Sequence, residues 1–163
     1  MDIAQSRRKE NIIMDERIKT LAYNLVHYSC RLKEGEKVWI SCNGIHPMPL
    51  VKQIIKEVYK VGATPFVKLM TNSLEREILL GATEEQQKLQ AEADSLLMKQ
   101  MDAFIGVRGE DNLTEQYDVP TEKLDLQNLF YDDPVHHQIR VPHTKWVVLR
   151  YPTNSMAQAA KSS

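Results

Sequence analysis

The sequence predicts an α/β fold in which a mostly parallel sheet is flanked by helices on both faces, giving three layers. Short segments rich in β-branched and aromatic residues alternate with segments whose apolar residues recur at helical spacing. The connections between successive strand-like segments are long enough to hold a helix. A right-handed crossover between parallel strands carries that helix onto a face of the sheet.

The first helix and the first strand are predicted within residues 15–42. Apolar residues recur there at steps of three and four, namely Ile18, Leu21, Ala22, Leu25, Val26 and Leu32. The polar run Lys33–Glu36 ends this pattern. The next segment, Lys37–Cys42, is short, apolar and β-branched, and Asn43–Gly44 follows it as a turn signal, so we expect a strand there.

A second helix should begin near Pro47, because proline suits the first turn of a helix, and it should end before Gly62. The segment Thr64–Met70 is then predicted as the second strand, which completes one βαβ unit. A short helix is expected over residues 74–80. A longer one should begin after Thr83, which can cap it with Gln86 in the position of a capping box.

The third strand is predicted at Asp102–Val107, where apolar residues occupy both parities, as they do in a strand covered on both faces. Residues 121–140 favour a helix that Pro134 should end or bend. The fourth strand is expected at Lys145–Tyr151, before Pro152. No glycine-rich dinucleotide or phosphate motif follows any strand, so the topology is Rossmann-like without a dinucleotide site.

These elements define the expected domain organisation. Residues 1–13 are polar and form an N-terminal extension, residues 14–158 form a single α/β domain, and residues 159–163 form a C-terminal tail. No segment is long and apolar enough to span a bilayer, and the N-terminus lacks a signal sequence, so a cytoplasmic location is expected. Cys30 and Cys42 lack metal-binding or disulfide spacing, and both should be reduced and buried.

The bulk charge gives no reason to expect a nucleic acid or an anionic membrane as partner. Lys and Arg together number 21 and Asp and Glu 22, which leaves a formal net charge of −1. No serine nucleophile stands in a hydrolase elbow. One cluster of potential metal ligands is visible, comprising Asp132, Asp133, His136, His137 and His143. Adjacent histidines cannot share one helical face, so a solvated loop is favoured over a metal site.

The loops that follow the strands are the best candidates for binding. In open parallel sheets, ligands meet the loops at the carboxyl ends of the strands. The loop after the third strand begins with an arginine, which can bind a carboxylate, and continues with acidic residues, which can meet an ammonium. Solvated loop charges are the alternative. The candidates for this substrate rim are Arg108, Glu110, Asn112, Asn43 and Thr153, and no catalytic or metal-binding residue is predicted.

Four sequence blocks, in order and at matching spacing, also carry a resemblance. They are MDERIKTLAYNLVHYSCRLKEGEKVWI, PLVKQIIKEVYKVGATPFV, FIGVRGEDN and WVVLRYPTNSMAQ. Together they resemble the N-terminal domain of the thermophilic-type metalloaminopeptidases, the aminopeptidase T and aminopeptidase S group. The likeness covers residues 14–158.

The resemblance implies a bimetallic aminopeptidase that releases N-terminal amino acids from peptides. It also implies that two divalent ions, zinc or cobalt, are held by a C-terminal metallopeptidase domain to which nothing in this chain corresponds. The chain alone is therefore expected to bind no cofactor, to be inactive, and to meet peptide substrate only with that domain as partner. A homodimer is a further arrangement that stays open. The alternative function is a stand-alone binding or interaction module.

Overall fold

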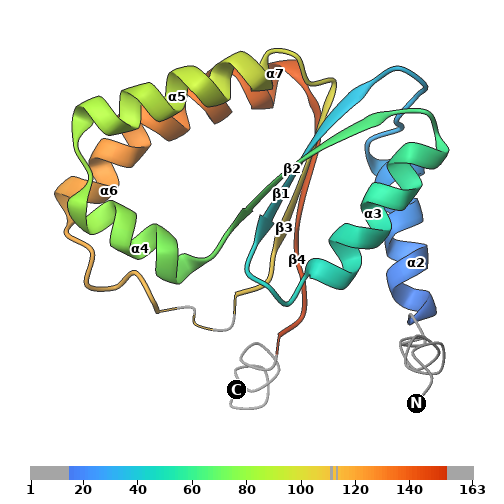
Figure 1. Ribbon diagram of the computed structural model, residues 1–163, viewed down its shortest axis with the longest axis horizontal. Helices are drawn as coiled ribbons and strands as arrows, with labels where there is room; N and C mark the ends of the chain where they lie inside the picture. The colour runs from blue at the N-terminus through green and yellow to red at the C-terminus, as the bar shows by residue number, and fades with distance from the viewer. Residues whose placement is uncertain (1–14, 111, 113, 154–163) are drawn as a thin grey trace, which may run out of the picture.

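The computed structural model describes residues 15–110, 112 and 114–153 (Figure 1). The predicted extension at residues 1–13 and the tail at residues 159–163 lie outside the described residues. The strands are β1 (Lys37–Asn43), β2 (Thr64–Met70), β3 (Ala103–Arg108) and β4 (Lys145–Arg150). The helices are α2 (Glu16–Tyr23), η1 (Asn24–Ser29), α3 (Met48–Lys60), α4 (Asn72–Gly81), α5 (Glu84–Met98), α6 (Thr121–Gln127), η2 (Asn128–Arg140) and α7 (Val141–His143).

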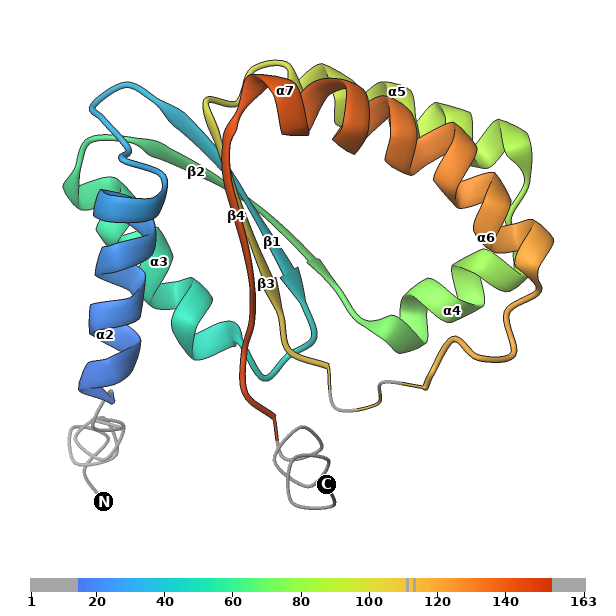
Figure 2. The same cartoon turned by 180° about the vertical axis from the view of Figure 1, so that it is seen from behind.

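The four strands form one parallel sheet in the order β2-β1-β3-β4. Helices α2, η1 and α3 cover one face, and α4, α5, α6 and η2 lie on the other side, as the two opposite views show (Figures 1 and 2). The predicted three-layer α/β fold is therefore confirmed. The chain reverses direction across the sheet between β1 and β3, because β2 lies on one side of β1 while β3 and β4 follow on the other.

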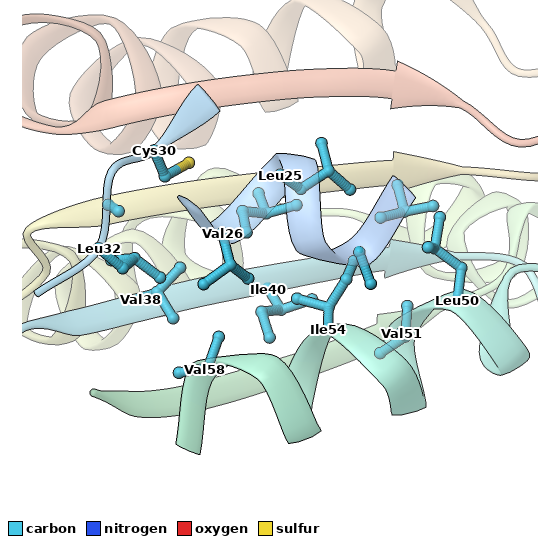
Figure 3. Packing of buried hydrophobic residues seen from close by; sticks show 14 of the residues in the cluster. Leu25, Val26, Cys30, Leu32, Val38, Ile40, Leu50, Val51, Ile54 and Val58 are labelled. Carbon is cyan, nitrogen blue, oxygen red and sulfur yellow. The ribbon is translucent and has the colours of Figure 1, made fainter. Parts of the chain in front are cut away.

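The larger core lies between the sheet and the layer formed by α2, η1 and α3. Figure 3 shows aliphatic side chains of η1 and α3 meeting those of β1. Val26, Ile54 and Ile40 are examples from the three elements, and all are fully buried. Burying one such side chain contributes about 1.5–3 kcal/mol. Cys30 also lies in this core, and Cys30 and Cys42 are free and buried as predicted.

A smaller core joins the opposite face of the sheet to α5 and η2. Trp39 and Phe104 extend from β1 and β3 and pack with Met98 and Val135 of the helices. Strand β3 is buried from Ala103 to Val107, as its unbroken apolar run predicts. This contact holds α5 and η2 close to the amino-terminal ends of the strands. Beyond the contact, the two helices extend away from the sheet (Figure 1).

The first helix differs from the prediction in its geometry. Its α-helical part ends at Tyr23, and the chain continues as the wider π-helix η1, in which the Cys30 amide donates to the Leu25 carbonyl at 3.0 Å. A π-helix pairs each amide with the carbonyl five residues earlier. The steps of three and four between apolar residues do not distinguish that pairing from an α-helix.

Of the two outcomes predicted for Pro134, that it ends or bends its helix, the first is wrong. Helices α6, η2 and α7 follow one another without interruption from Thr121 to His143, and Pro134 lies inside the π-helix η2. Proline breaks an α-helix because its ring meets the carbonyl four residues earlier, and π-type pairing changes which carbonyl lies opposite the ring. Full burial of the neighbouring Val135 in the core with α5 supports the continuous helix.

Candidate ligand-binding cavity

A cavity of about 680 Å³ lies between the second face of the sheet and the helices α4, α5, α6 and η2. Its floor is formed by alternate residues of the strands, including Trp39, Ser41 and Asn43 of β1 and Arg108 of β3. The volume falls in the range of about 300–1,000 Å³ that is usual for small-molecule sites. The cavity exists because the helices pack on the sheet through the small core and then diverge from it.

A hydrogen-bonded network around Asp94 supports one side of the cavity. The buried Asp94 carboxylate accepts hydrogen bonds from Lys68 Nζ at 2.5 Å, Tyr131 OH at 2.6 Å and Gln90 Nε2 at 3.1 Å. Burial alone would raise the pKa of Asp94, but the hydrogen bonds from Lys68 and Tyr131 outweigh burial and lower it. Burial and the Asp94 carboxylate raise the pKa of the Tyr131 phenol. Lys68 is thus a cation whose charge is neutralised within the protein.

Arg140 is held beside this network by aromatic rings. Its guanidinium carbon lies 4.9 Å from the ring centroid of Phe104 and 4.9 Å from that of Trp146, and its Nε donates to His136 Nδ1 at 3.0 Å. Burial and then the nearby Arg140 lower the pKa of His136 to about 4, so the imidazole is a neutral acceptor. Arg140 Nη1 is buried and has no hydrogen-bond partner in the part of the chain that the structure describes.

Arg108 and Asp132 bring further charges to the cavity wall. Arg108 is exposed at the carboxyl end of β3, and burial followed by the charge of Arg108 lowers the pKa of Arg140. Burial and then the Glu75 carboxylate raise the pKa of Asp132. Glu75 itself accepts hydrogen bonds from the amides of Gln116 and Gln127, at 2.7 and 3.2 Å.

Two of the five predicted rim residues line the cavity. Asn43 and Arg108 are partners in the register of β1 and β3, where the chain reverses direction across the sheet. That reversal point is where open α/β sheets bind ligands. The binding roles assigned to these residues stay predictions.

The other three rim candidates are not lining residues of the cavity, and their binding roles also stay predictions. Glu110 accepts a hydrogen bond from the backbone amide of Asn72 at 2.6 Å, which fastens the start of α4 to the loop after β3. The Asn112 side chain accepts from the Thr114 amide at 3.0 Å, within its own loop. Thr153 is buried and is not a lining residue of the cavity.

Several lining or supporting residues were not recognised in the sequence, namely Lys68, Glu75, Asp94, Tyr131 and Arg140. A signal existed for Lys68, which alternates with Phe66 and Met70 along β2 and therefore shares their face. The remaining side chains come from helices that meet only in the folded chain. Asp94 and Tyr131 are 37 positions apart in sequence, so no local pattern relates them.

The structure also corrects the prediction that the histidine cluster lies in a solvated loop. Residues 132–143 are not a solvated loop but helix, and His136 faces the cavity, stacked edge-on against Phe104 and Tyr131. His137 and His143 are exposed. Across the described residues, no group of three or more His, Cys, Asp or Glu side chains is arranged to hold a metal ion. Because Nδ1 of His136 already accepts from Arg140, this cluster does not fit a metal centre.

The fold is a three-layer α/β domain with a cavity between one face of its parallel sheet and the helices of that side. The chain belongs to the thermophilic metalloprotease (M29) family, whose sequence profile matches residues 14–162. This match confirms the family that the four sequence blocks indicate.

Solved structures agree on the fold. Wild-type AmpT from Thermus thermophilus superposes with a TM-score of 0.67 at 19% identity, over 90% of this chain and 38% of that one. The chain therefore spans well under half the length of AmpT. CurK enoyl reductase aligns with a TM-score of 0.38 at 11% identity, over 92% of this chain and 45% of that one, which is too distant to inform the function. No protein with a curated description matches the sequence. Within the described residues, every helix is too short or too polar to cross a membrane.

Proposed function

We propose that this chain is the N-terminal, substrate-shaping domain of a bimetallic aminopeptidase, and that it does not hydrolyse peptides by itself. The observation that carries the proposal is the family match over residues 14–162, because it spans nearly the whole chain. Coverage of only 38% of AmpT supports assigning a part of the activity rather than all of it. The cavity, which Arg108 lines, gives this domain a surface on which a substrate can be oriented.

The chemistry of the family supports inactivity of the isolated chain. Metal ions in a two-metal peptidase lower the pKa of a bound water and polarise the scissile carbonyl. The residues described here do not gather into a ligand set for such ions. We therefore assign the two metal ions, zinc or cobalt, to a metallopeptidase domain that acts as the partner of this one. The role left to this chain is to shape the site in which a peptide is positioned.

A peptidase assay tests this assignment. The purified chain should release no p-nitroaniline from leucine p-nitroanilide, with zinc or with cobalt, above the rate in a heat-denatured sample. Adding a metallopeptidase domain of the same family should restore hydrolysis. Turnover by the chain alone that a chelator abolishes would contradict the proposal, provided that a mock purification from the same host is inactive.

A stand-alone binding module is the second candidate, and one observation favours it. The cavity is lined both by the sheet and by helices of this one domain, so these two layers could hold a ligand between them. Sequencing the transcript beyond the codon for Ser163 separates the two candidates. A reading frame that continues into segments rich in Glu and His supports the peptidase, whereas a stop codon supports the module.

The proposal includes a cytoplasmic location. Cys30 and Cys42 are both free, and unpaired cysteines suit a reducing compartment. Burial raises the pKa of the Cys30 thiol to about 11, so the thiol is protected in the folded protein. Fractionation of cells that express a tagged full-length protein should recover it with cytoplasmic markers.

A further inference from the structure

Helix α4 forms a wall of the cavity that lies away from the sheet. Asn72, Glu75, Ile78 and Leu79 line the cavity from this helix, whereas the floor of the cavity is on the strands. Both views show α4 apart from the sheet, near the end of α5 that is farthest from it (Figures 1 and 2). Displacing α4 would therefore open the cavity on that side.

Apolar packing holds α4 only weakly. Among the described residues, α4 contributes no side chain to either of the two cores. All ten residues of the helix are described, and Leu79 alone is buried, whereas Leu74, Ile78 and Leu80 are exposed. Segments with few buried apolar contacts open at a lower free-energy cost than the core does. The packing thus allows α4 to open while the sheet stays folded.

Polar contacts fasten the middle of α4 to residues 116–127. The Glu75 carboxylate accepts a hydrogen bond from Gln116 Nε2 at 2.7 Å and another from Gln127 Nε2 at 3.2 Å. The next residue, Arg76, pairs with the exposed Asp118, to which its Nε donates at 2.8 Å. An exposed ion pair contributes little, so the two bonds to the half-buried Glu75 are the main attachment. Water can replace both bonds when the helix moves away.

The two ends of α4 have attachments of their own. The Asn72 amide donates to the Glu110 carboxylate at 2.6 Å, and Lys123 Nζ donates to the Ala82 carbonyl at 2.5 Å, just beyond the other end. An opening that keeps these two bonds is confined to α4 itself. A helix of ten residues is marginally stable in water without tertiary packing, so α4 should loosen once Glu75 leaves its partners.

We propose that α4 is a lid of the cavity, that Glu75 latches it shut, and that it opens locally while the sheet, α5 and η2 remain folded. The role of Glu75 is to position the lid. The inference goes beyond the proposed function, because it concerns access to the cavity and not what the cavity binds. It holds for a stand-alone module as well as for a peptidase domain.

Hydrogen exchange of the full chain, followed by mass spectrometry, tests whether α4 opens separately. Relative to their intrinsic rates, amides of α4 should exchange at least about tenfold faster than those of α5. Glu75→Ala should accelerate exchange in α4 about tenfold further and leave α5 unchanged, because two hydrogen bonds of the closed state are lost.

The matched control for the latch is Glu77→Ala, which removes the same side chain from the same helix. Glu77 is exposed and pairs only with its neighbour Arg76 in the described chain, so this variant should leave exchange in α4 within about twofold of the wild type. Equal protection of α4 and α5 in the wild type would overturn the proposal. An effect of Glu77→Ala as large as that of Glu75→Ala would overturn it as well.

Thiol labelling tests whether the opening admits small molecules to the cavity. Ser41→Cys places a thiol on the cavity floor, and Thr20→Cys places one on the exposed face of α2, in the opposite layer. Adding Glu75→Ala should accelerate labelling at position 41 about tenfold and leave position 20 unchanged, with the labelled residue identified by mass spectrometry. Labelling at position 41 that is unaffected by Glu75→Ala, or already as fast as at position 20, would overturn the lid.

Discussion

Replacing Asp94 by asparagine should destabilise the domain by about 2 kcal/mol. Asparagine keeps the shape of the side chain but removes the charge that neutralises Lys68, to which Asp94 is bound at 2.5 Å. Removing one partner of a fully buried ion pair costs about 3–5 kcal/mol. Here the Asp94 side chain is 13% exposed and that of Lys68 is 35% exposed, so water solvates part of the ammonium and the cost is reduced to about 2 kcal/mol.

Urea denaturation at neutral pH measures this change in the free energy of unfolding. Asp133→Asn is the control, because Asp133 is more exposed and its partner His137 lies on the surface, 3.4 Å away. Introducing Lys68→Met should cost about 1 kcal/mol less in the Asp94→Asn background than in the wild type, since the ion pair is then already lost. A change below about 0.5 kcal/mol for Asp94→Asn would refute the reasoning, because exposed pairs typically contribute about 0.2–1 kcal/mol and this pair would then be no stronger than they are.

The same pair gives the stability a pH dependence. The pKa of Asp94 in the folded state lies below its ordinary value of 3.8, so its contribution to stability is complete above that value. The contribution is lost as the pH falls further, through the folded-state pKa. The wild type should therefore lose more stability than Asp94→Asn when both are acidified below about pH 4. Parallel loss of stability in the two proteins would show that Asp94 is not the group responsible.

Three further predictions follow from local geometry. Gly109→Ala should lower stability in a thermal melt by about 2 kcal/mol, because the added Cβ would lie 2.4 Å from Cγ of Pro47. Gly81→Ala is the control and should be neutral or stabilising, since its Cβ would meet nothing within 4 Å. The Cys30 thiol, buried and with a pKa of about 11, should react with a thiol reagent near pH 7 only after unfolding, and fast reaction in the native state would contradict its burial. NMR titration of His136 should give a pKa near 4, which lies below the unfolded value of 6.5. The stability that the neutral imidazole contributes should therefore be lost as the pH falls from 6.5 to about 4.

The sheet and most of its connections could be predicted from the sequence because each depends on a local pattern. The second strand, Thr64–Met70, is observed at its predicted bounds, and Thr83 caps α5 by accepting from the Gln86 amide at 3.2 Å. Apolar residues on both parities of β3 likewise indicated a strand covered on both faces. Alternation, capping residues and helix-starting prolines are all properties of a few consecutive residues.

The cavity could be predicted only in part, because it is formed by residues that are distant in sequence. The position of Arg108 and Asn43 at the ends of parallel strands was sufficient to place both at one edge. Tyr131 and Arg140 could not be found in that way, since their helix passes through Pro134 with π-type pairing. The α-helical period therefore could not predict which residues of that segment face the sheet. The partner of Tyr131 on α5 and that of Arg140 on β3 are determined by tertiary packing.

Metal binding by the isolated chain tests the central claim most directly, since the claim is that this domain shapes substrate while another domain holds the catalytic ions. The measurement is a calorimetric titration of the full chain with zinc and with cobalt, followed in the same samples by the rate of leucine p-nitroanilide hydrolysis. The account predicts no stoichiometric binding and no hydrolysis, because the described residues contain no group of three or more His, Cys, Asp or Glu side chains that could hold a metal ion. Tight binding of two ions per chain, accompanied by hydrolysis that a chelator abolishes, would contradict it.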